Sequence, residues 1–174
     1  MNSSSGVLRY ASIGGALAAL LNVASLFLPA QLPLVLLQII PILFTVSLAF
    51  FYYGFVIIGR KCGNNPLRVF SYFFIVLNVL LLLVFSLGLY AQAINLDFWV
   101  TILNRDLGSI IGIGFALVLI PLFSRFGYLI AAYTTVLILS NAIFPFFGSS
   151  TIGSLLEFIS YFLGVLLLLR AARD

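Results

Sequence analysis

The stretch SIIGIGFALVLIPLFSRFGYLIAAYTTVLILSNAIFPFF, residues 109–147, decides how this chain folds. It is apolar almost throughout, and its one charged residue is Arg125. As a single α-helix it would be about 60 Å long, roughly twice the thickness of the hydrocarbon core of a bilayer. The stretch must therefore reverse direction around SRFG (124–127), and it predicts two membrane-spanning helices instead of one.

Further apolar segments lie on both sides of this hairpin, separated by short polar or proline-containing breaks such as PAQLP (29–33) and GRKCGNNP (59–66). Segments of about 20 apolar residues cross a bilayer as helices. We therefore expect an all-α integral membrane protein, a six-transmembrane-helix bundle that forms one domain over residues 1–174. The predicted spans lie near residues 10–28, 34–58, 69–91, 108–123, 128–147 and 151–169.

The overall composition supports a membrane protein. The chain is 64% hydrophobic and 7% charged, whereas a soluble domain carries about 25% charged residues. Its net charge is +4, and the Lys and Arg residues lie one to three at a time between the apolar segments. This distribution suits orientation in a membrane, so we expect the lipid bilayer as a partner and no nucleic acid.

The distribution of basic residues also predicts an orientation. With the N-terminus in the cytoplasm, seven of the eight Lys and Arg residues fall on the inner side, and Arg105 alone falls outside. Such an excess is the positive-inside pattern. The sequence thus predicts that the N-terminus and C-terminus are both cytoplasmic.

The longest predicted loop lies on the outer side, between spans three and four. Phe98, Trp99, Ile102 and Leu103 recur at helical spacing, with polar residues elsewhere on the helical wheel. This pattern predicts a short amphipathic helix in the outer membrane interface.

Glu157 is the acidic residue of the last predicted span. A carboxylate inside a membrane is costly and usually faces a bundle interior or a partner. It has two interpretations: a hydrogen-bonded group that holds helices together, or a carrier of protons or cations. Arg105, the outer cation, is a hypothetical ion-pair partner for it.

Amide residues within the spans extend this candidate pathway. Asn22, Gln38 and Asn141 are predicted to lie toward the outer ends of their spans and to form one outward-facing polar pocket with Glu157. Each can also serve simply as a hydrogen bond between helices.

Small residues mark close helix packing. Gly15 and Ala19 are spaced by four positions, as are Gly108 and Gly112, and such pairs let helices approach closely. A small face also runs along the last span, beside Glu157. Its members are Gly153, Ser154, Ser160 and Gly164.

The chemistry that the chain lacks limits its function. It has no His and a single Cys, so it cannot build a histidine-ligated metal centre or a Ser-His or Cys-His nucleophile within itself. It also has no Gly-rich phosphate loop and no recognisable pair of catalytic carboxylates. We therefore expect no enzyme activity, no cofactor, no metal site and no catalytic residue.

Two functions remain open. The first is a non-catalytic subunit that packs by its small-residue faces into a larger membrane complex or a homo-oligomer. The alternative is a small membrane transporter, or a substrate-binding transporter component, with an outward-facing polar pocket around Glu157. In its six spans, orientation and small size the chain is similar to the substrate-binding subunits of energy-coupling-factor vitamin transporters. Its compact, loop-poor form suggests a prokaryotic cell membrane.

Overall fold

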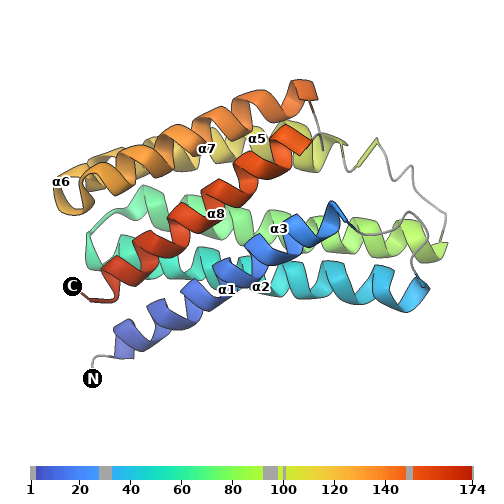
Figure 1. The fold of residues 1–174 in the computed structure, drawn as a ribbon, viewed down its shortest axis with the longest axis horizontal. Helices are drawn as coiled ribbons and strands as arrows, with labels where there is room; N and C mark the ends of the chain where they lie inside the picture. The colour runs from blue at the N-terminus through green and yellow to red at the C-terminus, as the bar shows by residue number, and fades with distance from the viewer. Residues whose placement is uncertain (1–2, 28–32, 92–97, 100, 148–150, 174) are drawn as a thin grey trace.

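The computed structural model describes residues 3–27, 33–91, 98–99, 101–147 and 151–173, and these residues are helical apart from short turns. They form a bundle of six helical rods (Figure 1). Five rods are the helices α1 (Ser3–Ser25), α2 (Leu34–Lys61), α3 (Asn65–Ala91), α7 (Tyr128–Phe147) and α8 (Thr151–Ala171). The remaining rod consists of η1 (Thr101–Leu107), α5 (Gly108–Leu119), η2 (Ile120–Leu122) and α6 (Phe123–Phe126).

The hairpin expected around residues 124–127 is present. Gly127 has a φ of 59°, a left-handed conformation that glycine adopts without steric cost, and α7 begins at the next residue. Just before it, Pro121 interrupts the α-helical hydrogen bonds and the chain forms the 3₁₀ turn η2. Two antiparallel rods therefore replace one long helix.

The turn between α2 and α3 is also fixed by local chemistry. Gly63 has a φ of 66°, which ends α2, and the Asn64 N–H returns to the Gly59 carbonyl at 2.8 Å. The Asn64 side chain then caps α3, because its Oδ1 accepts the N–H of Leu67 at 3.0 Å. Its Nδ2 donates to the Val118 carbonyl at 2.7 Å, which ties this turn to α5.

The segment between α3 and α5 is described only in part. Thr101–Leu107 form a π-helical segment that runs directly into α5 and extends the fourth rod, and the position of this segment relative to a membrane interface stays a prediction. Phe98 and Trp99 are exposed and contact each other edge to face at 5.6 Å, while residues 92–97 and 100 lie outside the described residues.

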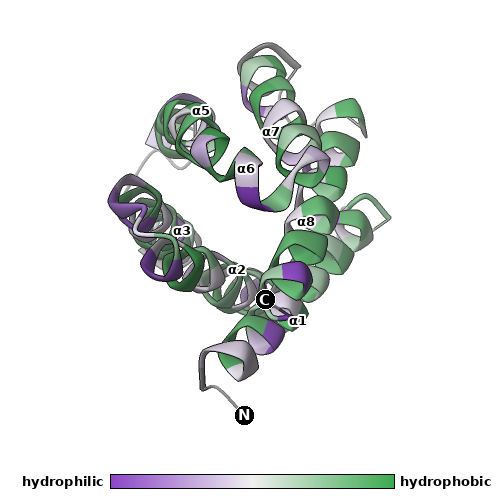
Figure 2. Ribbon diagram, turned by 90° about the vertical axis from the view of Figure 1, so that its left-hand side faces the viewer, coloured by the Kyte–Doolittle hydropathy of each residue, from purple (hydrophilic) through white to green (hydrophobic). Residues whose placement is uncertain are grey.

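The rods pack in a ring. Each of the pairs α2–α3, α3–α5, α5–α7 and α7–α8 is in contact, and α1 closes the ring by packing on both α2 and α8. The view along the bundle shows the helices in this order around the ring (Figure 2). The beginning of α1 and the end of α8 lie at the same end of the molecule (Figure 1).

Glycines allow a large ring to fill the α1–α2–α8 junction. The Phe51 side chain is fully buried between Gly15 of α1 and Gly164 of α8, and a Cβ atom on either glycine would overlap its ring. At Gly14 an added Cβ would lie 2.7 Å from the Ser47 carbonyl, so the α1 and α2 backbones are nearly in contact.

The basic side chains gather at the end of the bundle that contains both termini. Lys61 donates to the Ala171 carbonyl at 3.4 Å, Arg125 to the Cys62 sulfur at 3.4 Å, and Arg170 to the Phe126 carbonyl at 3.2 Å. Figure 2 views the molecule from this end, which we call the basic end, and hydrophilic segments are visible there on α1, α3, α6 and near the C-terminus.

The outer surface of the rods is apolar. Five helical segments are long and apolar enough to cross a membrane, and the described part of α7 contributes a shorter apolar run, Tyr128–Ile143. On α3, exposed side chains such as Val76, Leu83 and Leu87 face outward. The fold is thus a helical bundle suited to a membrane location.

Candidate functional site

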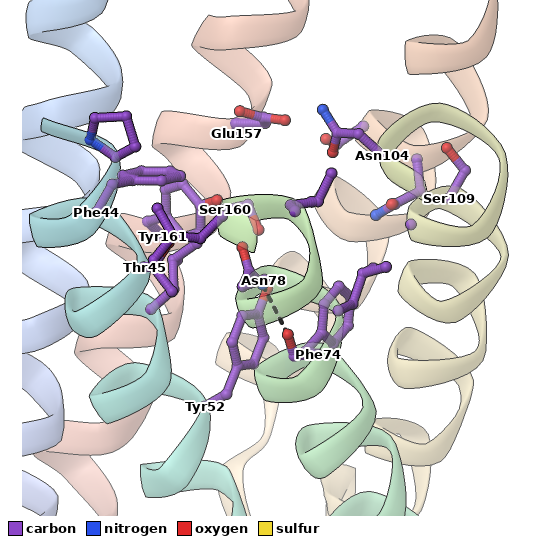
Figure 3. Close-up of a pocket in the computed structure, with 18 of the residues that line it drawn as sticks. Phe44, Thr45, Tyr52, Phe74, Asn78, Asn104, Ser109, Glu157, Ser160 and Tyr161 are labelled. Carbon is purple, nitrogen blue, oxygen red and sulfur yellow. Dashed lines mark hydrogen bonds between the residues drawn. The ribbon is translucent and has the colours of Figure 1, made fainter. Parts of the chain in front are cut away.

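A cavity of about 310 Å³ lies inside the ring, in the half of the bundle away from the basic end. Residues from α2, α3, η1, α5, α7 and α8 line it. The close-up shows these side chains converging from several helices (Figure 3). Its volume falls at the small end of the range for sites that hold small molecules.

The cavity has an aromatic floor, which we define as the rings of Tyr52 on α2 and Phe74 on α3. These rings are stacked, with centroids 4.4 Å apart and planes at 3°. The fully buried ring of Phe115 meets both edge to face, at 5.7 and 5.4 Å. Tyr52 lies about 14 Å along α2 from the basic end, at 1.5 Å per residue, which places the floor near the middle of a bilayer.

Glu157 lies in the wall toward the opposite end of the cavity (Figure 3). Its Oε2 accepts a hydrogen bond of 2.6 Å from Nδ2 of Asn22 on α1. Asn22 is itself buried, with 9% of its surface exposed, and its Oδ1 has no hydrogen-bond partner. This contact joins α1 to α8, while the Glu157 side chain also forms part of the cavity wall.

Two asparagines in the wall share one hydrogen-bonding pattern. Nδ2 of Asn78 donates to the Phe74 carbonyl one turn earlier on α3, at 2.8 Å. Nδ2 of Asn141 likewise donates to the Leu137 carbonyl on α7, at 2.8 Å. Each amide uses one N–H on its own helix, so its acceptor oxygen and its second N–H can bind another group.

The first part of the fourth rod, η1 and the start of α5, contributes Asn104 and Ser109 to the cavity wall. Asn104 belongs to the π-helical segment, a geometry often found at functional sites. Ser109 follows at the start of α5, is only 5% exposed and lines the cavity, and its Oγ has no hydrogen-bond partner. An unpaired buried hydroxyl is costly, so Ser109 is a polar group of the cavity wall that still lacks a partner among the described residues.

The structure brings together only part of the predicted pathway. Glu157 and Asn141 line the same cavity, and Asn22 reaches it through its bond to Glu157. Gln38 lies about a turn before the cavity on α2 and does not line it. The side chain of Arg105 lies outside what the structure describes, so its pairing with Glu157 stays a hypothesis.

The predicted packing residues mostly face other helices of the same chain. Gly15 and Gly164 contact the Phe51 ring, and the Asn141 amide covers Gly112 so closely that a Cβ there would overlap it. The other buried members of the set are Ala19, Gly108, Gly153 and Ser160, whereas Ser154 is partly exposed. These faces are thus largely covered within the monomer.

Sequence analysis did not single out several cavity residues. They are the hydroxyl residues Thr45, Ser109 and Ser140 and the amide Asn104. Single hydroxyls are common in membrane helices and give little signal one at a time.

No protein-family model matches this chain, and no curated protein and no solved structure matches it either.

Proposed function

We propose that this protein binds a small molecule in the cavity around Glu157, as a small membrane transporter or a substrate-capturing component of one. The single observation that carries the proposal is the convergence of polar groups on a cavity in an otherwise apolar bundle. Polar groups at membrane depth are costly and are kept where they bind each other or a ligand. Here the hydroxyl of Ser109 has no partner among the residues that the structure describes.

An orientation follows from the positive-inside rule. The basic end belongs in the cytoplasm, so both termini are cytoplasmic and the cavity faces the outer side, above the aromatic floor. Glu157 is then about 9 Å from the outer end of α8, at 1.5 Å per residue. The loop-poor bundle fits a prokaryotic cell membrane.

The competing function is a non-catalytic subunit of a larger membrane complex or homo-oligomer. The small residues give this function little support, because most of them are buried against other helices of the same chain. The exposed apolar faces do not decide the matter, because lipid covers such faces as well as protein does. We therefore rank ligand binding above assembly.

The test is native mass spectrometry of the protein extracted gently from its own membrane. The wild type should retain a small molecule, and Ser109→Leu, which places a larger side chain at the cavity wall, should lose it. Ser124→Leu is the matched control, because it makes the same change at an exposed position near the basic end. Thermal unfolding should first establish that both variants remain folded.

The opposite result is equally clear. If the wild type retains no small molecule and leaves the membrane with other polypeptides in a fixed ratio, the subunit function replaces ligand binding.

A further inference from the structure

We propose that the ligand of the cavity carries a primary ammonium group attached to a compact apolar or aromatic body. This inference rests on the proposed function, because it names the chemical class that the same cavity selects. It is drawn from the juxtaposition of Glu157, the acceptor oxygens of two asparagines and the aromatic floor in a single cavity.

The charge of the lining favours a cation. Among the described residues that line the cavity, Glu157 is the one carboxylate, and no Lys or Arg accompanies it. Among the described residues, Asn22, a neutral donor, gives Glu157 its one hydrogen bond. A carboxylate in a low-dielectric cavity interacts strongly with an opposite charge and excludes a like one.

The polar groups of the wall favour a cation that has N–H bonds. Asn78 and Asn141 each use one N–H of Nδ2 on a carbonyl of their own helix, which leaves each amide an acceptor oxygen and one further N–H. The hydroxyl of Ser109 is a further acceptor without a partner. An ammonium has three donors and no acceptor, and it therefore complements this set better than a group that must also receive hydrogen bonds.

The far end of the cavity favours an apolar or aromatic body. The aromatic floor forms the base of the cavity, and the rings of Phe44 and Tyr161 line its side wall between the floor and Glu157 (Figure 3). Such rings stack on apolar groups and also attract cations that lie over their faces. A ligand with its ammonium toward Glu157 and its body toward the floor would satisfy both ends.

Two sources supply this chemistry in a membrane: a free organic amine and the headgroup of an ethanolamine lipid. The shared feature is the primary ammonium. The lipid headgroup also brings a phosphate, for which the described lining has no basic partner.

The experiment measures binding to the protein in phosphatidylcholine nanodiscs by calorimetry, with four probes that differ only around the charged group. They are 2-phenylethylammonium, its N-trimethyl derivative, 2-phenylethanol and 3-phenylpropanoate. We expect 2-phenylethylammonium to bind at least about tenfold more tightly than any of the other three, as for a hydrogen bond to a charged group.

Variants assign the selectivity to the site. Glu157→Gln should weaken binding of the ammonium by about tenfold or more and change binding of 2-phenylethanol by less than about threefold. Ile159→Ala, which changes an exposed residue on the same helix, should alter neither. If Glu157→Gln proves unfolded, Ser109→Ala serves as the second variant and should weaken the ammonium selectively.

Each other outcome decides between the proposals. Equal binding of alcohol and ammonium overturns the charge selection but leaves the cavity as a binding site. Equal binding of the trimethyl derivative overturns the requirement for N–H bonds. Stabilisation only by phosphatidylethanolamine in the nanodisc, lost in Glu157→Gln, identifies the lipid headgroup as the source. If no probe and no lipid binds, the ligand class is overturned, whereas the proposed function fails only if the wild type also retains no small molecule in native mass spectrometry.

Discussion

At the scale of single residues, the fit around Phe51 shows how strictly this bundle is packed. Its ring occupies the space that a side chain at Gly15 or Gly164 would need. A few tenths of an ångström cannot relieve an overlap with a buried ring that has helices on both sides, because interiors are close-packed. Because these two glycines have no side chain, the Phe51 ring of α2 can pack against both α1 and α8.

Replacement of Gly15 by Ala should destabilise the protein by about 1–3 kcal/mol, the usual cost of overpacking. The matched control is Gly6→Ala on the same helix, where an added Cβ meets nothing within 4 Å. That change should be neutral or stabilising by up to about 1 kcal/mol, because alanine favours helix more than glycine does. The measurement is the midpoint of thermal unfolding in detergent.

A rescue variant separates packing from other causes. Adding Phe51→Leu to Gly15→Ala should recover part of the lost stability, because the smaller side chain makes room for the new methyl group. Equal losses in Gly15→Ala and Gly6→Ala would contradict the packing explanation.

At the scale of helices, the α2–α3 turn depends on the side-chain amide of Asn64, through both its oxygen and its nitrogen. The Oδ1 of Asn64 caps α3 at Leu67, while its Nδ2 holds the last turn of α5 at Val118. That carbonyl lies just before the 3₁₀ turn at Pro121, where the regular helical partners end. A single loop residue thereby sets how α3 and α5 meet at the basic end.

Asn64→Ala should cost about 1–2 kcal/mol of stability, as for the loss of a helix cap with a second contact. Asn64→Asp should cost less, because it keeps the acceptor for Leu67 and loses only the donor to Val118. The neighbouring change Asn65→Ala, at an exposed residue, should stay within about 0.5 kcal/mol of wild type. Thermal unfolding of the three variants in the same detergent distinguishes these effects, and an Asp variant as unstable as the Ala variant would refute the cap.

The positions of whole helices could be predicted from the sequence only in part. The hairpin around Arg125 followed from length, since the hydrocarbon core is too thin for one helix. The interfacial helix near Trp99 stays a prediction, because residue 100 lies outside the described residues and Thr101–Leu107 are helical but continue into α5. Hydrophobic periodicity fixes which residues share a face, but it does not say where a helix is interrupted.

At the scale of the whole molecule, the separation of the basic end from the cavity makes orientation testable. Cys62 is the one cysteine and lies at the basic end, beside Arg125. If that end is cytoplasmic, a membrane-impermeant maleimide should leave Cys62 unlabelled in intact cells and label it after permeabilisation. Cys62→Ser combined with Ser149→Cys, in the connection from α7 to α8, should react in intact cells. Labelling of Cys62 in intact cells would reverse the orientation.

The sequence by itself determined the membrane bundle, its six rods and the grouping of the basic residues between them. These properties depend on segment length, hydrophobicity and charge, which act locally or through the bilayer. Glu157 also stood out alone, because a carboxylate in an apolar helix is costly wherever the helix packs.

Only the tertiary structure decided which polar residues meet. It placed Asn22 against Glu157, brought Asn78, Asn104 and Ser109 around one cavity, and left Gln38 outside. It also assigned the small residues mostly to contacts within the chain. The physical reason is that the order of helices around the ring and their rotations depend on the fit of distant side chains, and no pattern along one helix encodes them.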